Sequence, residues 1–190
     1  MFTGIIKGRG NVKTVSGETH LKTVTIEAPS TWRFKKGESV NVSGICSTVV
    51  KSVKNSFDVE YMKETLDVTT AKFFTKNLAV NLEKSLKVGD PIDGHFVYGH
   101  IDTMGKITQF LKFKDQAKMQ IKIPIKYLKY IVYKGSVAVD GVSLTVSKKE
   151  TTYFEVSLIP YTISHTTLEK LKVGDNVNIE TDVIAKFAIK

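Results

Sequence analysis

The chain has 190 residues, of which 42% are hydrophobic and 25% charged, and these proportions are typical of a globular protein with one large domain or two small ones. Its apolar runs are far shorter than the roughly 20 residues needed to cross a bilayer, and Met1 begins no signal peptide, so we expect a cytoplasmic protein with no membrane partner. The single cysteine, Cys46, excludes an internal disulfide framework and a multi-cysteine metal site within one chain.

The formal net charge of +9 favours anionic partners in general. However, the lysines are spread along the whole chain, and only Arg9 and Arg33 are arginines. Because no basic stripe with interleaved aromatic residues is present, we expect no nucleic-acid partner.

The first half of the chain has the pattern of β-strands. Apolar and polar residues alternate in segments 23–27, 40–42 and 57–61, as they do in strands with one buried face. Between the second and third of these segments, Ser43-Gly44 predicts a hairpin turn.

The second half has the same character. Segment 127–133 fits a short helix, and Asp140-Gly141 predicts a type I′ hairpin turn, in which both central residues need positive φ. Segment 154–158 alternates like a strand, and Thr166-Thr167 fits the cap of a single helical turn that runs through Leu171.

The second half also repeats the first in one register. Segment 39–49 aligns with segment 136–146 at an offset of 97 residues, and near the start, where Phe2-Thr-Gly4 matches Val97-Tyr-Gly99, the offset is 95. The offset of 97 also pairs Phe57-Asp-Val59 with Phe154-Glu-Val156, Glu64-Thr-Leu66 with Tyr161-Thr-Ile163, Thr69-Thr70 with Thr166-Thr167, and Asn81-Leu-Glu83 with Asn178-Ile-Glu180. A chance likeness would not keep one register through separate blocks, so we infer a gene duplication.

The duplication predicts an all-β protein made of two tandem, homologous, six-stranded Greek-key barrels with a few short helices. Closed barrels also leave no exposed strand edge. The boundary is expected near residues 86–92, which gives domains 1–90 and 91–186 and a short tail, 187–190.

Strand alternation identifies candidate binding surfaces. Alternate residues from Val142 to Val146 are apolar and must face the core, so Ser143 and Thr145 point outward, and the repeat gives Cys46 and Thr48 the same position. Two equivalent polar slots of this kind suit a polar planar ligand on the outer barrel surface. The alternative is an ordinary exposed sheet face and a cysteine that behaves as a small core residue.

Two histidines stand among glycines in segment 93–102. His95 and His100 are five residues apart, which places them on opposite faces of a strand, so no shared metal ion is expected. We predict that His100 transfers protons and that His95 is a structural, hydrogen-bonded residue. His20 and His165 are expected at the surface.

These features together resemble the riboflavin synthase family. The resemblance runs in order over nearly the whole chain and is carried by Met1-Phe-Thr-Gly-Ile5, Gly44-Ile-Cys-Ser-Thr-Val49, Lys63-Glu-Thr-Leu66, Gly94-His-Phe-Val-Tyr-Gly-His-Ile-Asp102, Tyr133-Lys-Gly135, Asp140-Gly-Val-Ser-Leu-Thr-Val146, Ile159-Pro160, Val177-Asn-Ile-Glu180 and Asp182-Val-Ile-Ala-Lys186.

The resemblance implies a transferase without a cofactor. It would convert two molecules of 6,7-dimethyl-8-ribityllumazine into riboflavin and 5-amino-6-ribitylaminouracil by transfer of a four-carbon unit, the last step of riboflavin biosynthesis. In the family, the first barrel of one subunit faces the second barrel of a neighbour in a homotrimer, and an association with lumazine synthase is also implied. Holding the two substrates in contact would supply much of the rate.

The resemblance also assigns roles to residues. Cys46 would be the nucleophile or proton carrier, His100 an acid, base or positioning group, and Ser143 the matching residue of the second half, while Asp140 and Thr145 would polarise and orient the second lumazine. The rings and ribityl chains would be held by Phe2, Gly4, Ile5, Ile6, Ile45, Cys46, Ser47, Thr48, Glu60, Tyr61, Met62, Lys63, Glu64, Thr65, Gly99, His100, Ile101, Lys134, Ser143, Leu144, Thr145, Ser157, Leu158, Ile159, Pro160, Tyr161 and Thr162.

The sequence departs from the family pattern in a few places. Ser47 stands on the predicted core face where a leucine is usual, so it needs a partner or costs roughly 1–3 kcal/mol. Segment 75–79, Asp93 and Asp67-Val68 also differ from the usual residues. The chain stops at Lys190, short of the helix that holds the family's trimer, so a weakened trimer is expected.

Two other function classes compete with this interpretation. Lumazine-binding antenna proteins of luminous bacteria resemble the same family, bind the ligand without turnover and typically lack slot residues in one half. Here Cys46, His100, Asp140, Ser143 and Thr145 are all present, which favours an enzyme. An RNA-binding barrel has only the net charge in its favour.

Overall fold

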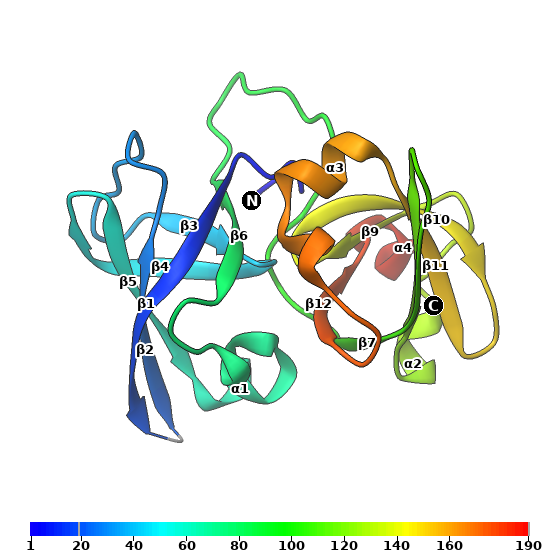
Figure 1. The fold of residues 1–190 in the computed structure, drawn as a ribbon, viewed down its shortest axis with the longest axis horizontal. Coiled ribbons are helices and arrows are strands. Elements are labelled where there is room, and N and C mark those ends of the chain that lie inside the picture. Colours follow the sequence, from blue (N-terminus) through cyan, green and yellow to red (C-terminus); the bar gives the residue numbers. More distant parts are fainter. Residues whose placement is uncertain (19, 190) are drawn as a thin grey trace.

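The chain folds into two closed, antiparallel, six-stranded barrels that lie side by side (Figure 1). The computed structural model describes residues 1–18 and 20–189. The all-β, duplicated fold predicted from the sequence is therefore confirmed.

The first barrel contains six strands in the spatial order β1-β2-β5-β4-β3-β6, and β6 pairs with β1 to close it. Its strands are β1 (Gly8–Glu18), β2 (Leu21–Glu27), β3 (Ser39–Val42), β4 (Ile45–Val53), β5 (Ser56–Met62) and β6 (Ala79–Lys84). Two short helices, α1 (Lys63–Val68) and η1 (Thr70–Phe73), connect β5 to β6.

The second barrel repeats this order as β7-β8-β11-β10-β9-β12. Its strands are β7 (Thr103–Lys112), β8 (Ala117–Lys122), β9 (Ser136–Val139), β10 (Val142–Lys149), β11 (Tyr153–Leu158) and β12 (Asn176–Thr181). Its helices are α2 (Ile125–Leu128), α3 (Pro160–His165), η2 (Thr167–Lys170) and α4 (Val183–Ala188).

Each barrel has its own hydrophobic core, built from the inward residues of alternating strands. In β4 and β10, buried residues alternate with more exposed ones, as the sequence pattern predicts. Even the strand irregularities are duplicated, because the register shifts at 49/51 in β4 and again at 146/148 in β10. The duplication therefore extends to details of strand geometry.

The predicted turns and caps are present. Ser43 and Gly44 have φ values of 46° and 90°, and Asp140 and Gly141 have values of 45° and 78°, as a type I′ turn requires. The Thr166 side chain accepts a hydrogen bond from the Leu168 backbone N–H and caps η2.

One helix differs from the prediction for segment 127–133. Helix α2 runs from Ile125 to Leu128, directly after Pro124, whose φ of −56° suits a helix start. The chain then turns so that Ile131 becomes fully buried. Pro124 accounts for the start two residues before the predicted segment, and the turn that brings Ile131 into the core follows the helix end at Leu128.

The connection between the barrels runs from the end of β6 at Lys84 to the start of β7 at Thr103. We propose that the domain boundary lies within it, as predicted for residues 86–92. Helix α4 extends past residue 186, so residues 187 and 188 belong to that helix and not to a separate tail. The Asp182 side chain caps α4 by accepting a hydrogen bond from the Ile184 N–H.

The polar residue predicted on the core face of the first barrel has a partner. The Ser47 hydroxyl donates to the Ile45 carbonyl oxygen at 3.0 Å and lies 2.9 Å from the Tyr61 hydroxyl. Since its own proton is used, Ser47 accepts the tyrosine's hydrogen bond. The expected energetic cost of an unpaired hydroxyl therefore does not arise.

No helix in residues 1–18 and 20–189 combines the length and the apolar character that crossing a membrane requires.

Candidate active site

The two halves exchange their opening segments. Phe2 and Val97, which are repeat equivalents, form an antiparallel bridge in which each backbone N–H donates to the other's carbonyl oxygen, at 2.7 Å and 3.1 Å. The segment after Phe2 then crosses to the second barrel, and the segment after Val97 crosses to the first. This arrangement relates the halves by an approximate two-fold axis.

Two buried carboxylates hold the crossing segments. Glu83 accepts hydrogen bonds from the Thr3 backbone N–H and hydroxyl, both at 2.8 Å, and from the Gly4 N–H at 3.1 Å. Glu180 repeats this with the Tyr98 N–H at 2.7 Å and the Gly99 N–H at 2.8 Å. Burial raises the pKa of both carboxyls, that of Glu180 to about 7, although the backbone hydrogen bonds oppose the shift.

The first slot forms where the crossing segment of the second half covers β4. The Cys46 backbone N–H donates to the Gly99 carbonyl oxygen at 2.8 Å, and the thiol is partly exposed. Gly99 has a φ of +77°, and a Cβ there would lie 2.5 Å from the Cys46 nitrogen, so only glycine fits. A cavity of about 280 Å³ is lined by Ile45, Cys46, Glu64, Thr65, Val68, Thr69, Gly99, His100 and Ile101.

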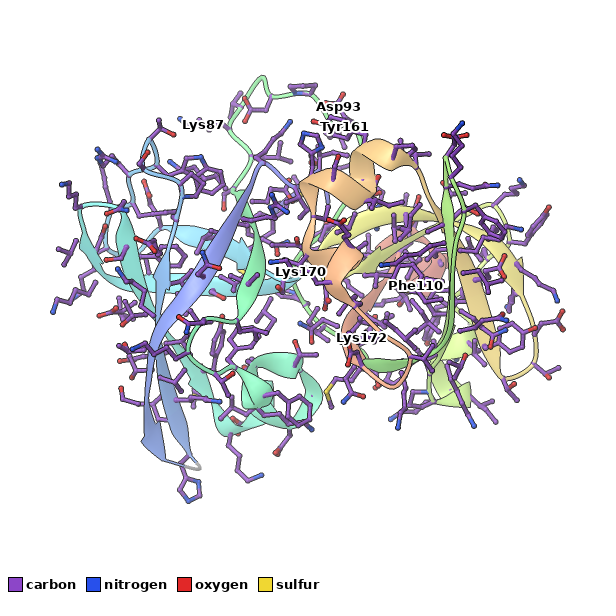
Figure 2. All side chains as sticks on the ribbon, in the orientation of Figure 1. Lys87, Asp93, Phe110, Tyr161, Lys170 and Lys172 are labelled. Atoms are coloured by element: carbon purple, nitrogen blue, oxygen red, sulfur yellow. The ribbon has the colours of Figure 1, made fainter. Side chains whose placement is uncertain are left out.

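The second slot has the same construction on β10. The Ser143 backbone N–H donates to the Gly4 carbonyl oxygen at 2.8 Å, and Gly4 also has a φ of +77°. Beside it, a cavity of about 320 Å³ is lined by Ile6, Lys7, Gly8, Arg9, Tyr161, Ser164 and His165. Tyr161 projects from α3, the repeat equivalent of the helix that borders the first slot (Figure 2).

The histidine next to the second slot contacts it directly. His95 Nδ1 lies 2.7 Å from the Ser143 hydroxyl, and the His95 backbone N–H donates to the Thr3 carbonyl oxygen. The prediction that His95 is a structural, hydrogen-bonded residue is confirmed. His100 is exposed and lines the first slot, while His20 and His165 are at the surface as predicted.

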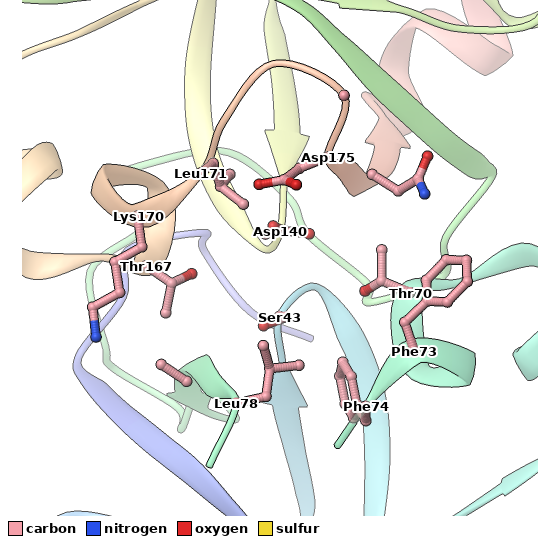
Figure 3. Close-up of a pocket in the computed structure, with 13 residues that line it drawn as sticks. Ser43, Thr70, Phe73, Phe74, Leu78, Asp140, Thr167, Lys170, Leu171 and Asp175 are labelled. Atoms are coloured by element: carbon pink, nitrogen blue, oxygen red, sulfur yellow. The ribbon is translucent and has the colours of Figure 1, made fainter. Parts of the chain in front are cut away.

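A third cavity, of about 400 Å³, lies between the barrels where the two hairpin turns meet. Figure 3 shows Ser43 on one turn and Asp140 on the other, with Thr70 and Thr167 on either side. The Asp140 carboxyl accepts a hydrogen bond from the Asn178 N–H at 2.7 Å, and its burial raises its pKa to about 7. Asp140 therefore faces this cavity and holds the turn that precedes Ser143, which corrects the expectation of a position among the slot residues.

Among the predicted binding residues, the first-slot set is brought together around Cys46, His100 and Glu64. The Phe2 side chain is fully buried against Val97 and Ala138, so a direct side-chain contact with a ligand is wrong for it. The side chains of Ser47, Tyr61, Leu144 and Leu158 are buried in the barrel interiors, so such a contact in the slots is wrong for these four as well. They stand at inward positions of their strands. The remaining outward or exposed positions are Thr48, Glu60, Met62, Lys63, Lys134, Thr145, Ser157, Ile159, Pro160 and Thr162.

Sequence reasoning missed the residues that assemble the slots. Glu83 and Glu180 hold the crossing segments, and Asn81 and Asn178 bridge the barrels. Their repeated Asn-x-Glu motif was visible in the sequence. Its conserved register across the two halves was the signal that could have identified them as structural polar residues.

Comparisons with known proteins agree with this architecture. The model of the family described as lumazine binding domain matches residues 3–85 and again residues 98–182. Riboflavin synthase of Bacillus subtilis is 37% identical over 98% of this chain and 87% of its own length, and that of Mycobacterium bovis is 38% identical over 98% and 96%. The crystal structure of LumP complexed with riboflavin has a TM-score of 0.89 over 95% of this chain and 99% of that one, which shows a shared fold at 24% sequence identity. With two lumazine-binding domains and relatives of this identity over nearly its whole length, the chain belongs to the riboflavin synthase family.

Proposed function

We propose that the chain catalyses the dismutation of two 6,7-dimethyl-8-ribityllumazine molecules to riboflavin and 5-amino-6-ribitylaminouracil. The observation that carries this proposal is the pair of equivalent outward slots, one in each half, because two identical substrates need two similar sites. In each slot, the carbonyl oxygen of a glycine accepts a hydrogen bond from the backbone N–H of the slot residue, which is Cys46 in one half and Ser143 in the other.

The chemistry requires a proton acceptor and a nucleophile or its activator. One lumazine must lose a proton from its C7 methyl group, and the other must be attacked at C7. In this proposal, Cys46 supplies the nucleophile or carries a proton, and His100, which lines the same cavity, acts as acid, base or positioning group. Ser143 and Thr145 orient the lumazine of the second half, and Asp140 positions their strand through its turn.

The cavity of the first slot and the cavity beside the second slot share no lining residue. This supports the further proposal that a neighbouring subunit completes the reacting pair, in a homotrimer. Location in the cytoplasm and an association with lumazine synthase are proposed on the family resemblance alone. Light scattering in solution tests the trimer, for which a mass three times that of one chain is expected and a monomer would contradict it.

The direct test is turnover. We expect purified protein to convert the dimethyl lumazine to riboflavin, followed by absorbance, and Cys46→Ser and Ser143→Ala each to reduce the rate at least about tenfold. Thr14→Ala, on the exposed face of β1, is the control and should keep full activity. Unchanged turnover in both slot variants would remove the proposed roles, and bound lumazine without product would instead favour the antenna function.

The antenna alternative is not favoured by the comparisons. Relatives that match the chain over nearly its whole length, at 36–38% identity, are named riboflavin synthase.

A further inference from the structure

The two slots differ in the partner of their outward side chain. Ser143 Oγ lies 2.7 Å from His95 Nδ1. In the described residues 1–18 and 20–189, no side chain forms a hydrogen bond with the Cys46 sulfur, whose thiol packs against Phe2, Val97 and Ala138. The two halves therefore differ in the hydrogen bonding of the residues that are proposed to act on the substrates.

His95 is fixed and buried. Its backbone N–H donates to the Thr3 carbonyl oxygen, and the residue is only 8% exposed. A Cβ on the preceding Gly94 would lie 2.0 Å from that same oxygen, so the backbone approaches too closely for any other residue. The imidazole therefore has one orientation toward Ser143.

Burial also favours the neutral form of the imidazole. It lowers the pKa of His95, and the charge of Asp182 at the start of α4 opposes this only in part. Of the other carboxylates near this segment, Glu83 accepts the hydrogen bonds of Thr3 and Gly4, and Asp93 is exposed. A neutral imidazole carries a proton on one ring nitrogen only.

The ring nitrogen that lacks a hydrogen-bond partner among the described residues indicates which nitrogen of His95 carries the proton. His95 Nε2 is buried and has no hydrogen-bond partner in the part of the chain that the structure describes. Buried N–H groups without an acceptor are rarer than acceptors without a donor, so the proton belongs on Nδ1. Nδ1–H then donates to Ser143 Oγ, and the serine's own proton is free to point into the slot.

We infer that His95 is a positioning residue that fixes Ser143 as a hydrogen-bond donor, and that the second slot consequently holds the lumazine that gives up its methyl proton. This inference rests on the proposed function and assigns different roles to its two substrate molecules.

A hydrogen-bond donor in the second slot favours the loss of the methyl proton from the lumazine bound there. When the C7 methyl C–H bond breaks, its electron pair moves into the ring system and places negative charge on ring nitrogen and carbonyl oxygen atoms, while the proton passes to a base, for which His100 of the facing first slot is the candidate. A hydrogen bond from Ser143 strengthens as this charge develops. Cys46, with a weakly donating thiol, offers the first slot less of this stabilisation.

The test measures the pH at which bound lumazine loses its methyl proton, by absorbance after rapid mixing and before riboflavin accumulates. We expect Ser143→Ala and His95→Leu each to raise this midpoint by about one pH unit, a tenfold loss of the anion. The double variant should be no worse than either single one, because His95 acts through Ser143. His95→Asn, whose amide can still donate, should restore most of the effect, and Cys46→Ala, the matched position, should leave the midpoint unchanged.

Additive effects of the two variants, or an equal shift in Cys46→Ala, would overturn the inference. A second measurement needs no variant: ¹⁵N NMR of the unmodified protein should show a protonated Nδ1 and an unprotonated Nε2 in His95, and the opposite tautomer contradicts it. Riboflavin formation by the unmodified protein is assayed separately. Its absence would refute the proposed function, whereas normal turnover with the wrong tautomer or additive effects refutes only the role of His95.

Discussion

Ser47 and Tyr61 form a polar pair where the second barrel has two leucines. The offset of 97 residues aligns Leu144 with Ser47 and Leu158 with Tyr61. All four side chains are buried, and the burial of Tyr61 raises the pKa of its hydroxyl far above the ordinary value. One barrel therefore fills this part of its core with a hydrogen bond and the other with aliphatic contact.

The hydrogen bond between Ser47 and Tyr61 should contribute to the stability of the fold. Ser47→Ala leaves the Tyr61 hydroxyl without its acceptor and should cost about 1–3 kcal/mol of unfolding free energy. Tyr61→Phe should cost less, about 0.5–1.5 kcal/mol, because the Ser47 hydroxyl keeps its bond to the Ile45 carbonyl oxygen. Urea denaturation measures both, and the double variant should cost less than the sum of the singles. Additive costs would mean that the two hydroxyls do not interact.

The same residues show what could be predicted from sequence. Alternation placed Ser143, Thr145, Cys46 and Thr48 outward correctly, because a strand repeats every two residues. It also put Tyr61 on the core side with Phe57, and the binding role assigned to its side chain by family resemblance contradicted that pattern. The physical periodicity was the better guide at this position.

At the scale of elements, β6 and β12 each send an asparagine into the opposite barrel. Asn178 on β12 donates to the Ser43 carbonyl oxygen and accepts from the Thr70 N–H, both at 2.7 Å. Asn81 on β6 donates to the Asp140 carbonyl oxygen at 3.0 Å and accepts from the Thr167 N–H at 2.8 Å. Each asparagine thus joins a hairpin turn to a 3₁₀ helix of its partner barrel.

We expect Asn81→Ala and Asn178→Ala each to lower the unfolding free energy by about 2–4 kcal/mol, because each leaves buried backbone groups unpaired. Asn11→Ala, at an exposed position of β1, is the matched control and should change stability by less than about 0.5 kcal/mol. Thermal and urea unfolding measure this. Equal losses in all three variants would show that the bridging bonds contribute nothing specific.

Elements with strong local signals were predictable, and contacts between distant elements were not. The Asp140-Gly141 turn and the cap at Thr166 follow from residue chemistry within a few positions. The crossing of the opening segments depends on hydrogen bonds between Glu83 and Gly4, which are 79 residues apart. No local pattern encodes such a pairing, although the repeated Asn-x-Glu motif marked the glutamate end of each one.

At the scale of the whole molecule, buried carboxyls at the junction of the barrels couple stability to pH. Asp140 and Glu180 have folded-state pKa values raised to about 7 by burial. A raised pKa means that the folded protein binds the proton more tightly than the unfolded chain does. Stability is therefore greatest at low pH in this window and decreases as pH rises from about 4 to about 7, by at most about 1.4 kcal/mol per pH unit for each carboxyl.

Asp140→Asn tests this coupling. The amide oxygen can still accept the hydrogen bond of the Asn178 N–H, but the side chain no longer titrates. We expect the pH dependence of the unfolding free energy between pH 4 and 7 to become shallower, as measured by urea denaturation across that range. An unchanged slope would show that Asp140 does not bind a proton on folding.

The exchange of opening segments bears on the history of the protein. A single ancestral unit could not have covered its own slot, because Gly4 lies on Ser143 and Gly99 lies on Cys46. Before the genes fused, the unit would have needed a second copy of itself to finish its slot, as a symmetric dimer with two identical sites. A fused pair of units can change each slot residue separately, and the present chain has a thiol in one slot and a histidine-bound hydroxyl in the other.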